Sequence, residues 1–121
     1  MALSTDGRTL CTATENALSQ DSLPSTVANG SSARILSFDV GTGLSKAEYV
    51  YNVAPVVLAP NPATTFATNG LTDMVAIGDR QFIAIERSFA TGSVTPGTPV
   101  TGIIIRLFHV DARNATDVSS M

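Results

Sequence analysis

The chain has 121 residues, enough for one domain, and a hydrophobic content of 44% excludes a disordered polar chain. Only 14% of residues are charged, the net charge is −3 and no basic run occurs, so no nucleic-acid partner is expected. No apolar stretch reaches about 18 residues, and the N-terminus lacks the basic and apolar segments of a signal peptide, so neither a membrane helix nor a leader is predicted.

Three strands are predicted in the first half of the chain. Residues 9–15 form an apolar run after Asp6-Gly7, which is a strong hairpin signal. Residues 33–40 alternate between two faces, and residues 47–53 are rich in aromatic and β-branched side chains. Serine-, glycine- and proline-rich stretches between these runs are predicted to be loops.

Three more strands are predicted in the second half, at residues 71–77, 80–87 and 103–111, with a tight turn at Gly78-Asp79. No segment has convincing helical periodicity. The sequence therefore predicts an all-β protein of about six strands. The strand at 80–87 has apolar residues on both faces, which indicates that a neighbour covers each face.

Two parts of the sequence resemble each other. Glu15 matches Glu86 at an offset of 71, and the run 34–39 matches 106–111 at an offset of 72. Repeated groups of antiparallel strands are typical of β-propeller blades. We therefore predict an incomplete antiparallel β-propeller-like structure of about two four-stranded blades.

In this interpretation the first blade spans 1–53 and lacks its innermost strand, apart from residues 1–4. The second blade spans 70–121 and lacks its outermost strand. Such a fragment has open sheet edges, so we expect self-association, rearrangement into a small sandwich or low stability.

The matched glutamates are the leading candidates for chemistry. Glu15 and Glu86 end equivalent strands in this alignment, and the loop before residue 71 brings Asn69 to the same rim. Carboxylate and carbonyl oxygens are the ligands that Ca²⁺ prefers, and bound Ca²⁺ can hold a phosphate and activate water. Arg87 offers a planar fork to a phosphate, so Glu86 and Arg87 are the predicted catalytic pair.

A structural interpretation of the same residues stays open. A glutamate at the end of a strand can accept backbone N–H groups from the following loop, or pair with Arg87 or Arg106 of the same blade. Features repeated within one chain often solve a repeated packing problem.

Other chemistry-bearing residues are expected to be structural. Cys11 is the single cysteine and lies in mid-strand without a neighbouring base, which indicates a buried thiol. His109, the single histidine, takes the repeat position of Ser37, and Asp39 and Asp111 precede turns. The sequence has no G-x-S-x-G elbow, phosphate-binding loop, dinucleotide fingerprint or zinc cluster.

The stretches "NGLTDMVAIGDRQFIAIERSF" and "IRLFHVDARNATDVS" resemble the phytase-like family, also described as "esterase-like activity of phytase". The matching elements are 69–71, 79–88 with its E-R-S motif, and 110–119 with its A-T-D-V-S motif. The resemblance covers nearly the whole chain and about half or less of a full family domain. It implies a secreted or periplasmic β-propeller-like hydrolase acting on phosphate or carboxylate esters. The alternatives are a non-catalytic binding or structural module and a truncated remnant without activity of its own.

Overall fold

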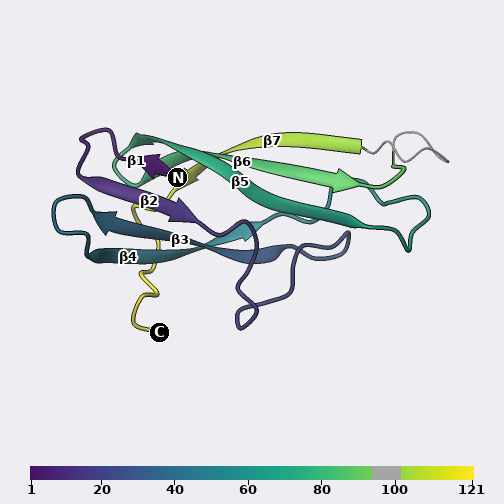
Figure 1. Ribbon diagram of the computed structural model, residues 1–121, viewed down its shortest axis with the longest axis horizontal. Coiled ribbons are helices and arrows are strands. Elements are labelled where there is room, and N and C mark those ends of the chain that lie inside the picture. The colour runs from purple at the N-terminus through teal and green to yellow at the C-terminus, as the bar shows by residue number, and fades with distance from the viewer. Residues whose placement is uncertain (94–101) are drawn as a thin grey trace.

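The computed structural model describes residues 1–93 and 102–121 and shows two layers of antiparallel strands (Figure 1). The strands are β1 (Ala2–Leu3), β2 (Thr9–Ala13), β3 (Ser31–Asp39), β4 (Ser45–Val53), β5 (Ala67–Gly78), β6 (Gln81–Ala90) and β7 (Gly102–Asp111). These described residues contain no helix at all, and so none that is long and apolar enough to cross a membrane.

Each sheet is a simple meander in which every strand pairs with the next one along the chain. Sheet A has the order β1-β2-β3-β4 and sheet B the order β5-β6-β7, with all pairs antiparallel. The all-β prediction is confirmed, and each of the six predicted strands is present. The additional strand, β1, pairs Ala2 with Cys11 and lies beside β2. It falls within residues 1–4, the stretch that the sequence offers as the candidate for an innermost strand.

The two sheets pack face to face and enclose a single core. Side chains alternate between the faces, so every second residue of β3 and β6 points inward. We call the faces that meet the inner faces of the sheets and the opposite ones the outer faces. The core residues are Ala2, Cys11, Ala33, Ile35, Val53, Leu71, Met74, Phe82 and Ala84.

The turn between β5 and β6 differs from the prediction by one residue. Gly78 pairs with Gln81, so the two turn residues are Asp79 and Arg80 instead of Gly78 and Asp79. An irregularity in the pairing shifts the register between Ala76 and Gly78, and within the turn Arg80 has φ 49°. This is left-handed backbone that a non-glycine residue seldom adopts.

The pairing of β2 with β3 repeats in β6 with β7 at an offset of 72 residues. Thr9 pairs with Asp39, and Gln81 pairs with Asp111. At the other end of these strands the Thr14 N–H donates to the Arg34 carbonyl over 3.0 Å, and 72 residues further on Glu86 pairs with Arg106.

This register corrects the predicted match between the two glutamates. Glu86 takes the place of Thr14 in the second sheet, and Glu15 takes the place that Arg87 has there. A shift of one residue moves a strand's side chains to the opposite face. The two glutamates therefore do not occupy equivalent positions.

The C-terminal segment runs from the end of β7 back to the free edge of β4 (Figure 1). The Val118 N–H donates to the Glu48 carbonyl over 2.8 Å. The Asp117 carboxylate accepts the Glu48 N–H over 3.0 Å and the Ser119 N–H over 2.9 Å. The A-T-D-V-S motif is thus a strap that fastens the end of sheet B to sheet A and occupies part of an open strand edge.

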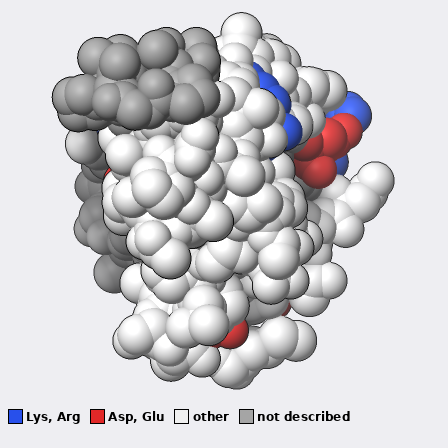
Figure 2. All heavy atoms as spheres, turned by 90° about the vertical axis from the view of Figure 1, so that its right-hand side faces the viewer, with Lys and Arg blue, Asp and Glu red and all other residues white. Residues whose placement is uncertain are grey.

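The turns β1–β2, β3–β4 and β5–β6 lie together at the left end of Figure 1. Figure 2 shows the opposite end of the molecule, where most of the described surface in view belongs to neither acidic nor basic residues, apart from a group of both signs at the upper right. A charged ligand would therefore find more complementary groups at the turn end.

Candidate functional site

Glu86, the leading candidate from the sequence, is buried between the two sheets with 1% of its surface exposed. Its Oε1 accepts the Tyr51 hydroxyl over 2.8 Å and the Ala54 N–H over 3.2 Å. Its Oε2 accepts the Asn69 amide over 2.7 Å and the Arg106 guanidinium over 3.3 Å. Four donors from four segments therefore surround one carboxylate. The Arg106 guanidinium balances its negative charge, and the hydrogen bonds replace those that the carboxylate would make to water.

Successive residues of the E-R-S motif point to opposite faces of sheet B. Glu86 and Ser88 point inward and hold the linker after β4, since the Val57 N–H donates to the Ser88 hydroxyl over 3.0 Å. Arg87, between them, is exposed on the outer face. The predicted catalytic pair of Glu86 and Arg87 therefore has its two side chains on opposite faces of sheet B, and the partner of Glu86 is Arg106.

Glu15 lies just beyond β2, which ends at Ala13, and is exposed. Its carbonyl accepts the Leu71 N–H over 2.9 Å, a backbone hydrogen bond between the two sheets. Its side chain lies so close to Gly70 that a Cβ there would come within 2.5 Å of the Glu15 Cγ. Gly70 is therefore a position of close approach that requires the absence of a side chain.

The predicted calcium ligands Glu15, Glu86 and Asn69 thus all contact the stretch 69–71 or belong to it. Calcium needs six to eight oxygen ligands. Both Glu86 oxygens already accept two donors each, and the Asn69 Nδ2 donates to Glu86 and to the Ala54 carbonyl. The Asn69 Oδ1 is buried without a hydrogen-bond partner among the described residues, so it is the single uncommitted oxygen of Glu86 and Asn69. The described residues contain no group of three or more acidic, histidine or cysteine side chains able to hold a metal ion. As they stand, these residues do not fit a calcium site.

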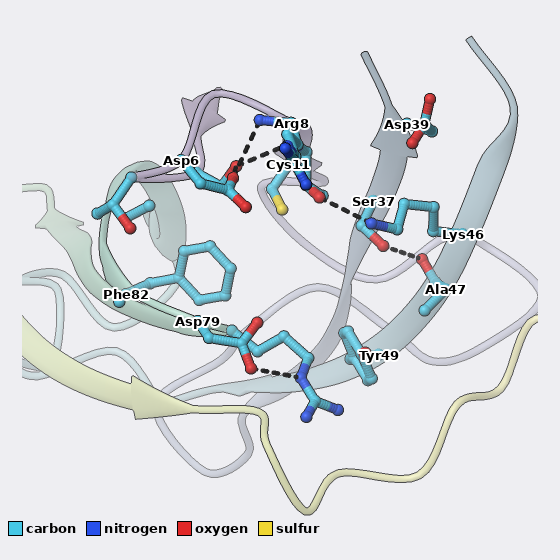
Figure 3. Close-up of a pocket in the computed structure, with 16 residues that line it drawn as sticks. Asp6, Arg8, Cys11, Ser37, Asp39, Lys46, Ala47, Tyr49, Asp79 and Phe82 are labelled. Atoms are coloured by element: carbon cyan, nitrogen blue, oxygen red, sulfur yellow. Dashed lines mark hydrogen bonds and ion pairs between the residues drawn. The ribbon is translucent and has the colours of Figure 1, made fainter. Parts of the chain in front are cut away.

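A cleft opens between the sheets at the end that carries the three turns (Figure 3). Its volume is about 720 Å³, within the range of small-molecule sites. Figure 3 shows side chains of sheet A, among them Arg8, Cys11 and Lys46, across the opening from Asp79 and Phe82 of sheet B. Both sheets therefore contribute to the walls.

Three basic residues line this cleft, and each comes from a different turn region: Arg8, Lys46 and Arg80. The Lys46 ammonium donates to the Thr9 hydroxyl over 2.9 Å, and Arg80 lies 3.5 Å from Asp79. The Arg8 guanidinium makes no side-chain hydrogen bond or ion pair within the described parts of the chain. Arg8 is exposed where it lines the cleft.

The acidic residues of the cleft are engaged mainly with their own turns. Asp6 accepts the Ser4 hydroxyl over 2.6 Å and the Arg8 N–H over 3.0 Å, and these bonds lower the pKa of its carboxyl. Asp39 accepts the Thr42 N–H and hydroxyl, which lower the pKa of that carboxyl likewise. These two carboxylates stay ionised and stabilise their turns.

Cys11 also lines the cleft but is buried, as the sequence predicted. Burial raises the pKa of its thiol, which keeps the sulfur protonated and weakly nucleophilic. His109 lies on the outer face and its Nε2 is 3.2 Å from the Gln81 side-chain oxygen.

Sequence reasoning did not single out Arg8, Lys46 or Arg80. They are separated along the chain, they form no motif, and only the packing of the two sheets brings their turns together. The available signal was indirect: Arg8 follows Gly7, Arg80 follows Asp79, and Lys46 lies three residues after Gly43.

Comparison with known proteins gives one match. No curated protein and no solved structure matches the chain. The model of the phytase-like family, described as esterase-like activity of phytase, matches residues 1–121. The match extends over the whole chain, which includes the E-R-S and A-T-D-V-S motifs that tie the two sheets together, and the chain therefore belongs to the phytase-like family.

Proposed function

We propose that this chain is part of a phytase-like hydrolase that acts on phosphate or related esters and that holds the anionic end of its substrate in the cleft between the sheets. The family membership supports ester hydrolysis. The observation that carries the proposal is the convergence of Arg8, Lys46 and Arg80 on one cleft of about 720 Å³.

The chemistry of these groups suits a phosphate ester. A guanidinium presents several donors in a planar fork that matches phosphate oxygens, and an ammonium adds a compact charge. In the transition state for attack of water on a phosphate ester, negative charge is spread over the phosphoryl oxygens and develops on the leaving oxygen. Fixed cations at that position lower the barrier because they stabilise the transition state more than the ground state.

The test measures phosphate release from 4-nitrophenyl phosphate and alcohol release from 4-nitrophenyl acetate, with added Ca²⁺ and with a chelator. We expect Arg8→Gln and Lys46→Gln each to reduce turnover of the phosphate ester at least about tenfold. Dependence on Ca²⁺ would show that calcium assists the reaction. Loss of activity in Arg87→Gln, with Arg8→Gln unaffected, would place the site on the outer face and contradict the cleft.

A second candidate function is a non-catalytic module that binds anionic ligands. It is favoured by the buried and fully hydrogen-bonded state of Glu86, which leaves the strongest candidate carboxylate of the sequence without a free oxygen. Calorimetric titration with inorganic phosphate distinguishes the two candidates. Saturable binding that depends on Arg8 and Lys46, with no turnover of either ester, would establish the binding module.

A further inference from the structure

The outer face of sheet B is a continuous apolar surface. Its most exposed members are Leu107 at 66% and Ile105 at 62%. Adjacent strands extend this surface, since Leu107 pairs with Ile85 and Ile83 pairs with Val75. The large apolar side chains on this face are Val75, Ile77, Ile83, Ile85, Phe89, Ile103, Ile105 and Leu107.

The five most exposed of these side chains leave roughly 500 Å² of apolar surface, and a monomer's largest patch is usually about 300–600 Å². The partly exposed Ile83, Ile85 and Phe89 add to that area. A stable interface takes about 800 Å² from each partner, which is within reach of this face. With these three side chains the exposed apolar area approaches one side of a standard-size interface.

The other sheet of the chain shows what such a face does when it is covered. At the offset of 72 residues, Ile105 and Leu107 correspond to Ala33 and Ile35 of sheet A. Ala33 and Ile35 are completely buried because sheet B packs on them. The same strand position thus lies in a core in one sheet and at the surface in the other.

We propose that the outer face of sheet B binds a second copy of this chain, face to face about a two-fold axis. A two-fold contact joins the same patch on both copies, so two apolar faces cover each other without any other partner. Within the described residues this face carries few polar or charged side chains, with Arg87 in its middle and Asp73, His109 and Asp111 toward its margins. The long apolar stem of Arg87 allows its guanidinium to reach water at the rim.

The outer face of sheet A is less suited to cover the outer face of sheet B. It carries an ionic cluster in which Arg34 binds Asp21 over 2.6 Å and Glu48 over 2.7 Å. Asp21 belongs to the loop between β2 and β3, so that loop covers part of the face. Packing an apolar sheet on this cluster would desolvate three charged groups.

The experiment measures molar mass by sedimentation over a range of protein concentrations. We expect the native chain to reach twice its monomer mass and Leu107→Glu to remain a monomer over the same range. Leu107 is exposed in the single chain, so the variant is expected to fold, and circular dichroism checks this directly. Val50→Glu is the matched control, because Val50 is 47% exposed on the outer face of sheet A; it should dimerise like the native chain.

Each other result overturns the proposal. A native chain that stays monomeric up to millimolar concentration would show that a second copy does not bind this face. A dimer that survives Leu107→Glu would show association elsewhere, such as through the edge of β7. Dissociation by both substitutions would indicate head-to-tail stacking of sheet B on sheet A.

Discussion

The side-chain amide of Asn69 donates to the carboxylate of Glu86 over 2.7 Å, with Asn69 completely buried and Glu86 1% exposed. Asn69 belongs to β5 of sheet B, and its amide also donates to the Ala54 carbonyl in the linker that follows sheet A. The pair therefore joins both sheets and the segment between them. Both oxygens of Glu86 have their donors, while the Asn69 Oδ1 is buried without a partner among the described residues. Removal of one donor or acceptor from such a buried network is costly, because it leaves a further polar atom unpaired.

Glu86→Gln is expected to lower the free energy of unfolding by about 2–3 kcal/mol, because Arg106 loses its partner and an amide donor replaces an acceptor among four donors. Urea unfolding followed by circular dichroism measures the loss. Arg87→Gln is the matched control, since Arg87 is the exposed neighbour, and it should change stability by less than about 0.5 kcal/mol. Equal effects in the two variants would contradict the proposed role of Glu86 as a tie between the sheets.

Gly70→Ala is expected to destabilise the chain by about 1–3 kcal/mol, because the new Cβ would lie 2.5 Å from the Glu15 Cγ. Glu15→Ala removes that Cγ and should change stability little by itself. The double variant Gly70→Ala with Glu15→Ala should then recover much of the loss. A double-mutant cycle based on thermal unfolding measures this coupling, and simple additivity of the two single effects would refute the clash.

Alkaline pH is expected to unfold the protein through Tyr51. Burial, and next the Glu86 carboxylate that its hydroxyl contacts, raise the pKa of Tyr51 above its ordinary value of 10.0. The unfolded chain therefore loses this proton first. The stability that Tyr51 contributes is complete below about pH 10 and falls as pH rises toward its folded pKa. Urea midpoints measured from about pH 9 to pH 11 should fall less steeply in Tyr51→Phe than in the native chain; equal slopes would contradict this assignment.

The C-terminal strap is expected to respond to acid and to Asp117→Asn. Hydrogen bonds from the Ser119 and Glu48 N–H groups lower the pKa of the Asp117 carboxyl. Its contribution to stability is therefore present above the ordinary pKa of an aspartate and is lost as pH falls through the lower folded value. Amide hydrogen exchange at Glu48 and Ser119 should accelerate in Asp117→Asn near neutral pH. Unchanged exchange would show that the strap does not depend on this carboxylate.

The positions of the strands could be predicted from the sequence because alternation and turn residues act over short distances. The runs at 33–40 and 103–111 differ from β3 and β7 by only a residue or two at their ends. The turn after β5 could not be placed to the residue, because an irregularity in pairing with β6 moved it. Such shifts depend on packing between strands and leave no local signal.

The candidate site was less predictable than the fold. The glutamates were matched at an offset of 71, but the strand pairing requires 72. Because of this one-residue difference, Glu86 is buried between the sheets whereas Glu15 is exposed. The motif residues Glu86, Ser88 and Asp117 proved to connect the sheets. The cleft cations were not predicted, because their neighbourhood depends on contacts between distant turns.

The sequence by itself determined the all-β class, the strand positions and the resemblance to a family, since these follow from side-chain alternation, backbone preferences and short motifs. Only the tertiary structure decided which residues face each other between the sheets. The burial of Glu86, the cleft at the turn end and the uncovered face of sheet B all depend on how the two sheets pack, and packing is a property of residues that are far apart along the chain.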